Sequence, residues 1–217
     1  DPPFVSLSDD NPTKAESGKM VTIKGEFSDN IGVVSSELTW SPADAVSAPA
    51  QPIDFMNKSV DLNISNGFSG QFTYTVEVKD ASGNSSTDSG TIYVDDRTKP
   101  EITDSTGDTD AGTGDYVKIE ANVSDNVGLD KVLLYWVKID AGQETEVTMS
   151  TTGGDIYEAT LNMDPNKVGE ATYYILARDT SGNFSRDPKT GSYTITVKDN
   201  DPPDISIARG DITATTG

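Results

Sequence analysis

Hydrophobic side chains alternate with polar ones in several short runs of the chain. This period of two residues is typical of strands with one buried face. In the first half of the chain the pattern predicts strands at residues 20–28, 34–40, 72–79 and 91–95. Residues 43–50 are the best rival for a helix, but Pro42 and Pro49 interrupt that segment. The pattern therefore predicts an all-β chain.

The pattern occurs twice. Residues 18–33 match residues 114–129 at an offset of 96, and Trp40 falls on Trp136. Residues 72–86 match residues 171–185 at an offset of 99, so a short insertion lies between the two matches. Repeat starts recur at residues 1–5, 98–102 and 201–205. The repetition predicts module 1 at residues 1–96 and module 2 at residues 97–200. Residues 201–217 should hold the first strand of a truncated third module, at residues 204–208.

Each module has the length, short strands and frequent turns of an immunoglobulin-like β-sandwich. Ala141-Gly142 separates two alternating runs and predicts a hairpin. We expect Trp40 and Trp136 to lie in the two cores, with sugar stacking as the alternative role. Tyr74 and Tyr173 are candidates for the tyrosine corner of such sandwiches. The predicted fold is thus a tandem of immunoglobulin-like β-sandwiches.

Composition excludes several kinds of chemistry. The 217 residues include 36 acidic and 16 basic side chains, a net charge of −20, and neither Cys nor His. Triad catalysis that depends on His, thiolate metal sites and disulfides are therefore excluded, and the acidity argues against nucleic acid as a partner. Paired carboxylates could hydrolyse glycosides, but they lie in turns without an apolar pocket, so we expect no enzyme activity. No apolar run is long enough for a membrane span.

Acidic residues recur at three kinds of position. Together with neighbouring amides they lie in the turn between the strands predicted at 20–28 and 34–40, in the turn before the last strand, at the equivalent turns of module 2, and in the linkers between modules: Asp29, Asp80, Asp95, Asp96, Asp125, Asn126, Asp179, Asn183, Asp199 and Asp201. In such a sandwich both turns lie at the end where the chain enters, so the first linker should meet Asp125 and Asp179. Oxygen ligands of this kind suit Ca²⁺. The sequence therefore predicts a calcium site at the module junction.

Two further interpretations concern the same polar residues. Asp and Asn at strand ends commonly form Asx turns, which explains the motifs without a cation. Five sequons for N-linked glycosylation start at Asn57, Asn63, Asn84, Asn122 and Asn183. Their number slightly exceeds chance and fits a glycosylated outer surface.

Two motifs resemble known families. The run Tyr-Thr-Val-Glu-Val-Lys-Asp-Ala-Ser-Gly-Asn at residues 74–84 and the Ser-Asp-Asn-x-Gly turns resemble tandem immunoglobulin-like repeats of bacterial and archaeal surface proteins, such as S-layer proteins and adhesins. Residues 197–203 are similar to the Asp-x-Asn-Asp-x-Pro junction of cadherins, although the acidic motif that completes a cadherin calcium site is missing. These resemblances imply an extracellular setting.

The expected function is a non-catalytic structural module of a cell-surface protein: an S-layer unit, a stalk or an adhesin spacer. Its expected partners are neighbouring modules of the same parent protein, further copies in self-assembly, or surface glycans. The alternative is a spacer or carbohydrate-binding region of a secreted enzyme. An exposed strip of aromatic side chains would favour that alternative.

Overall fold

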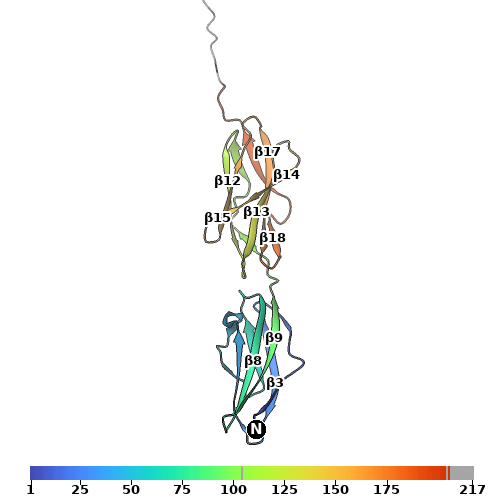
Figure 1. Ribbon diagram of the computed structural model, residues 1–217. Coiled ribbons are helices and arrows are strands. Elements are labelled where there is room, and N and C mark those ends of the chain that lie inside the picture. Colours follow the sequence, from blue (N-terminus) through green and yellow to red (C-terminus); the bar gives the residue numbers. More distant parts are fainter. Residues whose placement is uncertain (104, 204, 206–217) are drawn as a thin grey trace, which may run out of the picture.

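The computed structural model describes residues 1–103, 105–203 and 205. The chain forms two β-sandwiches arranged end to end, so the molecule is a rod with a narrow neck between its halves (Figure 1). Strands β1 to β9 build the first sandwich, and β10 to β19 build the second. Among the described residues no sheet contains strands from both sandwiches. The neck therefore depends on the linker and on side-chain contacts.

Module 1 packs a four-stranded sheet against a five-stranded sheet. The first has the order β1–β3–β7–β5, from Phe4–Leu7, Met20–Ser28, Ser59–Ile64 and Val46–Ala48. The second has the order β2–β9–β8–β4–β6, from Lys14–Glu16, Ser85–Asp95, Gly70–Asp80, Val33–Ser41 and Ile53–Asp54. The strand pairs are antiparallel except β2 with β9. That parallel pair ties the start of the module to its last strand, beside the neck.

Module 2 repeats this architecture. One sheet has the order β10–β12–β16–β15, from Glu101–Thr103, Tyr116–Ser124, Ile156–Asn162 and Ser150–Gly153. The facing sheet has the order β11–β19–β17–β13–β14, from Thr109–Gly112, Tyr193–Lys198, Gly169–Asp179, Leu129–Val137 and Glu144–Thr148. The short strand β18, Phe184–Asp187, also pairs with β17. The single strand β9 of module 1 therefore corresponds to two strands in module 2, β18 and β19.

Each sandwich has its own hydrophobic core between its sheets. Alternate residues of each inner strand point inward, so Val76 and Val78 are fully buried while Glu77 between them faces outward. Trp40 and Trp136 are both 6% exposed, which confirms the core role predicted for them. Two separate cores allow each module to be stable without the other.

The sequence pattern located the inner strands well. The strand predicted at residues 20–28 is β3, and those predicted at 34–40 and 72–79 lie within β4 and β8. The predicted hairpin at Ala141-Gly142 joins β13 to β14. The rival helical segment contains only the short 3₁₀ turn η1, Ala43–Ala45. The predicted strand 204–208 and the rest of the third module lie outside the described residues, apart from positions 201–203 and 205.

Two expectations need correction. The last strand of module 1 begins at Ser85, six residues before the predicted start, because polar and small residues pair with β8 there without adding to the core. Tyr173 does not form a tyrosine corner, because its hydroxyl donates to the Gly107 carbonyl (2.7 Å), far upstream in the sequence. Burial raises the pKa of Tyr173 and keeps its hydroxyl in the donating form.

Candidate metal centre at the module junction

Three carboxylates from three separate segments converge at the neck. Asp96 follows β9 in the linker, Asp125 lies in the turn between β12 and β13, and Asp179 ends β17. One carboxylate oxygen from each lies within 4.8 Å of the others. Asp96 and Asp179 are 5% and 1% exposed. The structure therefore brings together the three acids that the sequence placed at one junction.

Local turns hold the two acids of module 2. Oδ1 of Asp125 accepts hydrogen bonds from the backbone N–H groups of Val127 (3.0 Å) and Gly128 (2.9 Å). Asp179 accepts from the backbone N–H of Asn183 (2.8 Å) and from its side-chain amide (2.7 Å). These are Asx-type turns, so turn formation explains the positions of both residues. It does not explain why the two turns face an acidic linker.

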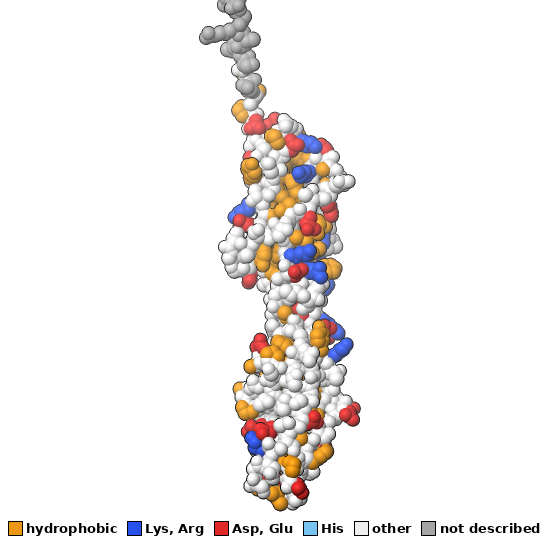
Figure 2. All heavy atoms as spheres, in the orientation of Figure 1, with side chains coloured by type: hydrophobic (Ala, Val, Ile, Leu, Met, Phe, Trp, Pro, Cys, Tyr) orange, Lys and Arg blue, Asp and Glu red, His pale blue; other side chains and the backbone are white. Residues whose placement is uncertain are grey.

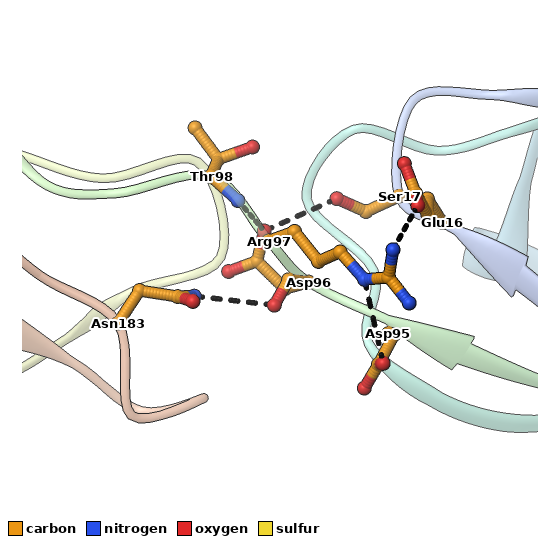
Figure 3. Close-up of polar contacts among 7 residues, drawn as sticks. All are labelled: Glu16, Ser17, Asp95, Asp96, Arg97, Thr98 and Asn183. Atoms are coloured by element: carbon orange, nitrogen blue, oxygen red, sulfur yellow. Dashed lines mark hydrogen bonds and ion pairs between the residues drawn. The ribbon is translucent and has the colours of Figure 1, made fainter.

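Asp96 connects the linker to both modules. Its Oδ1 accepts from the Thr98 backbone N–H (3.1 Å), from the Ser17 hydroxyl (3.3 Å) and from the Asn126 amide (3.2 Å), and Figure 3 shows the first two of these bonds. The second oxygen, Oδ2, is buried and has no hydrogen-bond partner among the described residues. Asp125 Oδ2 and Asn126 Oδ1 share this condition. Three buried oxygens of junction residues therefore have no donor in the part of the chain that the structure describes.

Arg97, the cation next to Asp96 in the sequence, forms its ion pairs with other acids. The guanidinium of Arg97 lies 2.6 Å from Glu16 and 3.7 Å from Asp95, away from the Asp96 carboxylate (Figure 3). Like charges in a partly desolvated site repel, and buried acceptors without donors cost free energy. A hard divalent cation relieves both problems, since Ca²⁺ takes six to eight oxygen ligands. The donor set of Asp96, Asp125, Asp179 and Asn126 fits such an ion.

Polar contacts across the neck fix how the modules meet. The Asn126 amide donates to the Asn66 carbonyl of module 1 (2.6 Å), and the Asn183 amide donates to the Asp96 backbone carbonyl (3.1 Å). A methyl group on Gly67 would lie 3.1 Å from the Asn126 carbonyl, so the two modules approach closely here. Sequence reasoning missed Ser17, Asn66 and Gly67. No local motif marks them, because they reach the site only through the fold.

The other predicted ligands lie away from this cluster. Asp95 is exposed and pairs with Arg97. Asp29 and Asp80 lie in the equivalent turns at the opposite end of module 1, where Asp80 accepts from Asn84 as Asp179 does from Asn183. At the far end of module 2, Asp199 accepts from the Asp201 backbone N–H (3.1 Å), as Asp96 does from Thr98.

The predicted sequons differ in their surroundings. Asn57, Asn63 and Asn84 are exposed, and Asn122 is half-buried. The Asn183 amide donates to both Asp96 and Asp179. A glycan on that nitrogen would displace one of these bonds, so Asn183 suits the junction better than it suits a glycan.

Comparisons with known proteins identify the fold. No protein-family model matches the chain, and no curated protein matches it. Among solved structures it is similar to the D1–D4 ectodomain fragment of ICAM-5, with 11% identity, a TM-score of 0.52 and coverage of 97% of this chain and 55% of that one. It is also similar to a tetra-tandem repeat from the extending region of a large adhesion protein, with 17% identity, a TM-score of 0.50 and coverage of 90% and 49%.

A third similar structure is the titin Z1Z2 pair in complex with telethonin, with 16% identity, a TM-score of 0.37 and coverage of 91% of this chain and 96% of that one. The predicted class, tandem immunoglobulin-like β-sandwiches, is confirmed. The chain spans about half the length of the ICAM-5 and adhesion-repeat chains. In the part of the chain that the structure describes, no helix is long and apolar enough to cross a membrane.

Proposed function

We propose that this chain is a non-catalytic spacer in the extracellular part of a cell-surface protein, of the S-layer, stalk or adhesin kind. Two sandwiches joined end to end (Figure 1) give the chain the reach that a spacer needs. The similar repeat from an adhesion protein supports this proposal at the level of the fold. The rod's mechanical role then depends on how stiff the neck is.

A divalent cation, with Ca²⁺ as the expected ion, stiffens that neck. The observation that carries this proposal is the convergence of Asp96, Asp125 and Asp179 beside buried oxygens that have no donor among the described residues. Asp96 belongs to the linker and the other two acids to module 2. An ion held by all three ties the linker to the sandwich and removes the repulsion among the carboxylates.

Thermal unfolding with and without calcium tests this function. Extracellular calcium modules bind at roughly 10⁻⁴–10⁻³ M, so millimolar Ca²⁺ should raise the Tm of the wild-type chain by several degrees over its value in EDTA. Magnesium at the same concentration is the ion control. Mg²⁺ should raise the Tm less, because it requires a nearly ideal octahedron of oxygen ligands at shorter distances than Ca²⁺ does.

A matched pair of variants assigns the effect to the junction. Asp96→Asn keeps the size of the side chain but removes one ligand charge, so the calcium-dependent rise should largely disappear. Asp95→Asn removes a neighbouring exposed charge and should keep the full rise. Equal rises in both variants, or none in the wild type, would leave the junction acids as turn formers and contradict the cation proposal.

A further inference from the structure

A groove on module 2 is separate from the neck cluster. Strands β10 and β18 come from opposite sheets and line a cavity of about 570 Å³ on the open side of the sandwich. Ile102 and Phe184 supply its apolar surface, and Phe184 is 58% exposed. Phe184 therefore gives the groove an exposed apolar surface.

The groove gathers cations in a strongly acidic molecule. Lys99, Arg186 and Lys189 line it, against the two acids Glu101 and Asp187. Asp187 already accepts hydrogen bonds from the Ser105 and Tyr193 hydroxyls. Among the described residues none of the three cations forms an ion pair, whereas the whole chain has more than two acids for each base. Figure 2 shows Lys and Arg side chains gathering at this end of module 2, toward the neck.

One of these cations is fixed in place. The Arg186 guanidinium lies 3.8 Å from the centre of the Tyr174 ring and donates hydrogen bonds to the carbonyls of Pro188 and Gly191. The Lys99 ammonium lies 5.7 Å from the centre of the Phe184 ring. Charges that are held in position before binding lose less entropy when a partner arrives.

Both strands beside the groove have a free edge. Among the described strands β10 pairs only with β12, and β18 pairs only with β17. An edge of this kind presents backbone N–H and C=O groups that another polypeptide can pair with. A polysaccharide has no backbone that matches this spacing, so the free edges favour an extended polypeptide.

Module 1 has no equivalent surface. The residue aligned with Phe184 is Ser85, and the one aligned with Arg186 is Thr87. Pro2 aligns with Lys99, and the segment that carries Lys189 is an insertion. In both modules a carboxylate links the two edges: Asp88 accepts from the Leu7 backbone N–H (2.7 Å), and Asp187 accepts from the Ser105 hydroxyl. The modules therefore differ in the side chains that line the edges. The fold alone does not require the groove, so the side chains of module 2 create it.

We propose that the groove binds an acidic, extended segment of a partner protein, which adds as a short strand along the free edge of β18. The backbone edge provides the pairing, and the three cations select for negative charge. Phe184 provides an apolar contact for alternate side chains of the segment. This inference goes beyond the spacer function and does not depend on a cation at the neck.

Fluorescence anisotropy with the whole chain tests the proposal. The probe is a labelled peptide that alternates aspartate with valine, which suits both the charge and the extended conformation. Three control ligands accompany it: the peptide with lysine in place of aspartate, the acidic peptide with a methylated backbone, and dextran sulfate. Only the unmodified acidic peptide should bind, and moderate salt should weaken its binding.

Charge-reversal variants locate the site. Lys99→Glu combined with Lys189→Glu should weaken peptide binding about tenfold, since two exposed charge contacts are reversed. Lys14→Glu combined with Lys24→Glu changes the net charge equally on module 1 and should leave binding unchanged. Equal losses in both variants would show a non-specific effect of net charge.

The remaining outcomes overturn the proposal. If the methylated peptide or dextran sulfate binds as tightly as the acidic peptide, the groove recognises charge alone. If no probe binds, the lysines only protect a free sheet edge from aggregation. If the chain self-associates through the groove, a second copy is the occupant and the partner proposed here is wrong.

Discussion

Buried aspartates define the ends of both modules at the scale of single residues. Asp80 is 2% exposed, and its carboxylate accepts hydrogen bonds from the Ser82 backbone (2.8 Å), the Asn84 backbone (2.9 Å) and the Asn84 side chain (2.7 Å). Asp179 has the same relation to Asn183 in module 2. The Asp-x-Ser-Gly-Asn motif therefore closes a hairpin in both modules. It faces a linker carboxylate at the neck, where it also becomes a candidate ligand.

The pH dependence of stability should report on Asp80. The Asn84 side-chain amide lowers the pKa of Asp80 below its ordinary value of 3.8, burial opposes this, and backbone N–H donors add to the lowering. A lowered pKa in the folded state stabilises the fold above the unfolded-state value. That stabilisation is lost as the pH falls through the folded value. Asp80→Asn should reduce the Tm at pH 7, and its difference from wild type should shrink in acid.

The measurement is a series of thermal melts from neutral to strongly acidic pH. Asp44→Asn, which changes an exposed carboxylate, is the control and should follow the wild-type curve throughout. A constant difference between Asp80→Asn and wild type at every pH would show that the residue acts through shape and not through its charge.

At the scale of strands, the period of two was a sufficient guide to the inner sheets. It placed β3 at its observed limits because Val21 and Ile23 must face the core while their neighbours face water. It could not extend β9 back to Ser85, since residues such as Thr87 and Ser89 pair through the backbone without a hydrophobic signal. It could not show the parallel pairing of β2 with β9, because those strands lie near the beginning and the end of the module's sequence.

Gly90 tests how tightly strand and core fit. A methyl group built there would lie 2.3 Å from the Tyr74 hydroxyl oxygen and 2.4 Å from the ring carbon that carries it. Tyr74 is 3% exposed and cannot swing into solvent without opening the core. Gly90→Ala should therefore lower the free energy of unfolding of module 1 by about 1–3 kcal/mol.

Urea denaturation of the whole chain measures this loss, with module 2 as the internal reference. Tyr74→Phe in the Gly90→Ala background should give little relief, because the ring carbon still overlaps the new methyl group. An unchanged midpoint for Gly90→Ala would mean that the Tyr74 ring can move aside, and that the core at this point is looser than the distances indicate.

At the scale of the whole molecule, the sequence established more about the neck than about the groove. The repeat offset and the sandwich topology were enough to predict that Asp96, Asp125 and Asp179 lie close together. The module 1 side of the neck, with Ser17 and Gly67, could not be inferred, since those residues lie in turns that carry no chemical signal. The groove between β10 and β18 was also missed, because two short edge strands from different sheets line it.

Gly67 offers a way to change the neck and leave both cores intact. A methyl group there would lie 3.1 Å from the Asn126 carbonyl oxygen of module 2, so the contact between the modules must open by a few tenths of an ångström to admit it. Gly67→Ala should therefore weaken the coupling between the modules. In calcium the wild-type modules should unfold close together, because the ion would hold Asp96, which also accepts a hydrogen bond from Ser17 of module 1. In calcium, Gly67→Ala should show two separate calorimetric transitions. In EDTA, the midpoint of each module in Gly67→Ala should equal its midpoint in the wild type.

The equivalent position in module 2 supplies the control. The Lys167 backbone N–H donates to the Asp164 carbonyl as that of Phe68 does to Ser65, so Asn166 occupies the place of Gly67. Asn166→Ala changes that turn but not the neck, and it should leave the calcium-dependent coupling intact. If both variants keep the wild-type coupling, the close approach of Gly67 to Asn126 does not transmit it, and the proposal for Gly67 is wrong. If only Gly67→Ala uncouples them, close contact at Asn126 is part of what transmits the effect of the ion from the linker to both sandwiches.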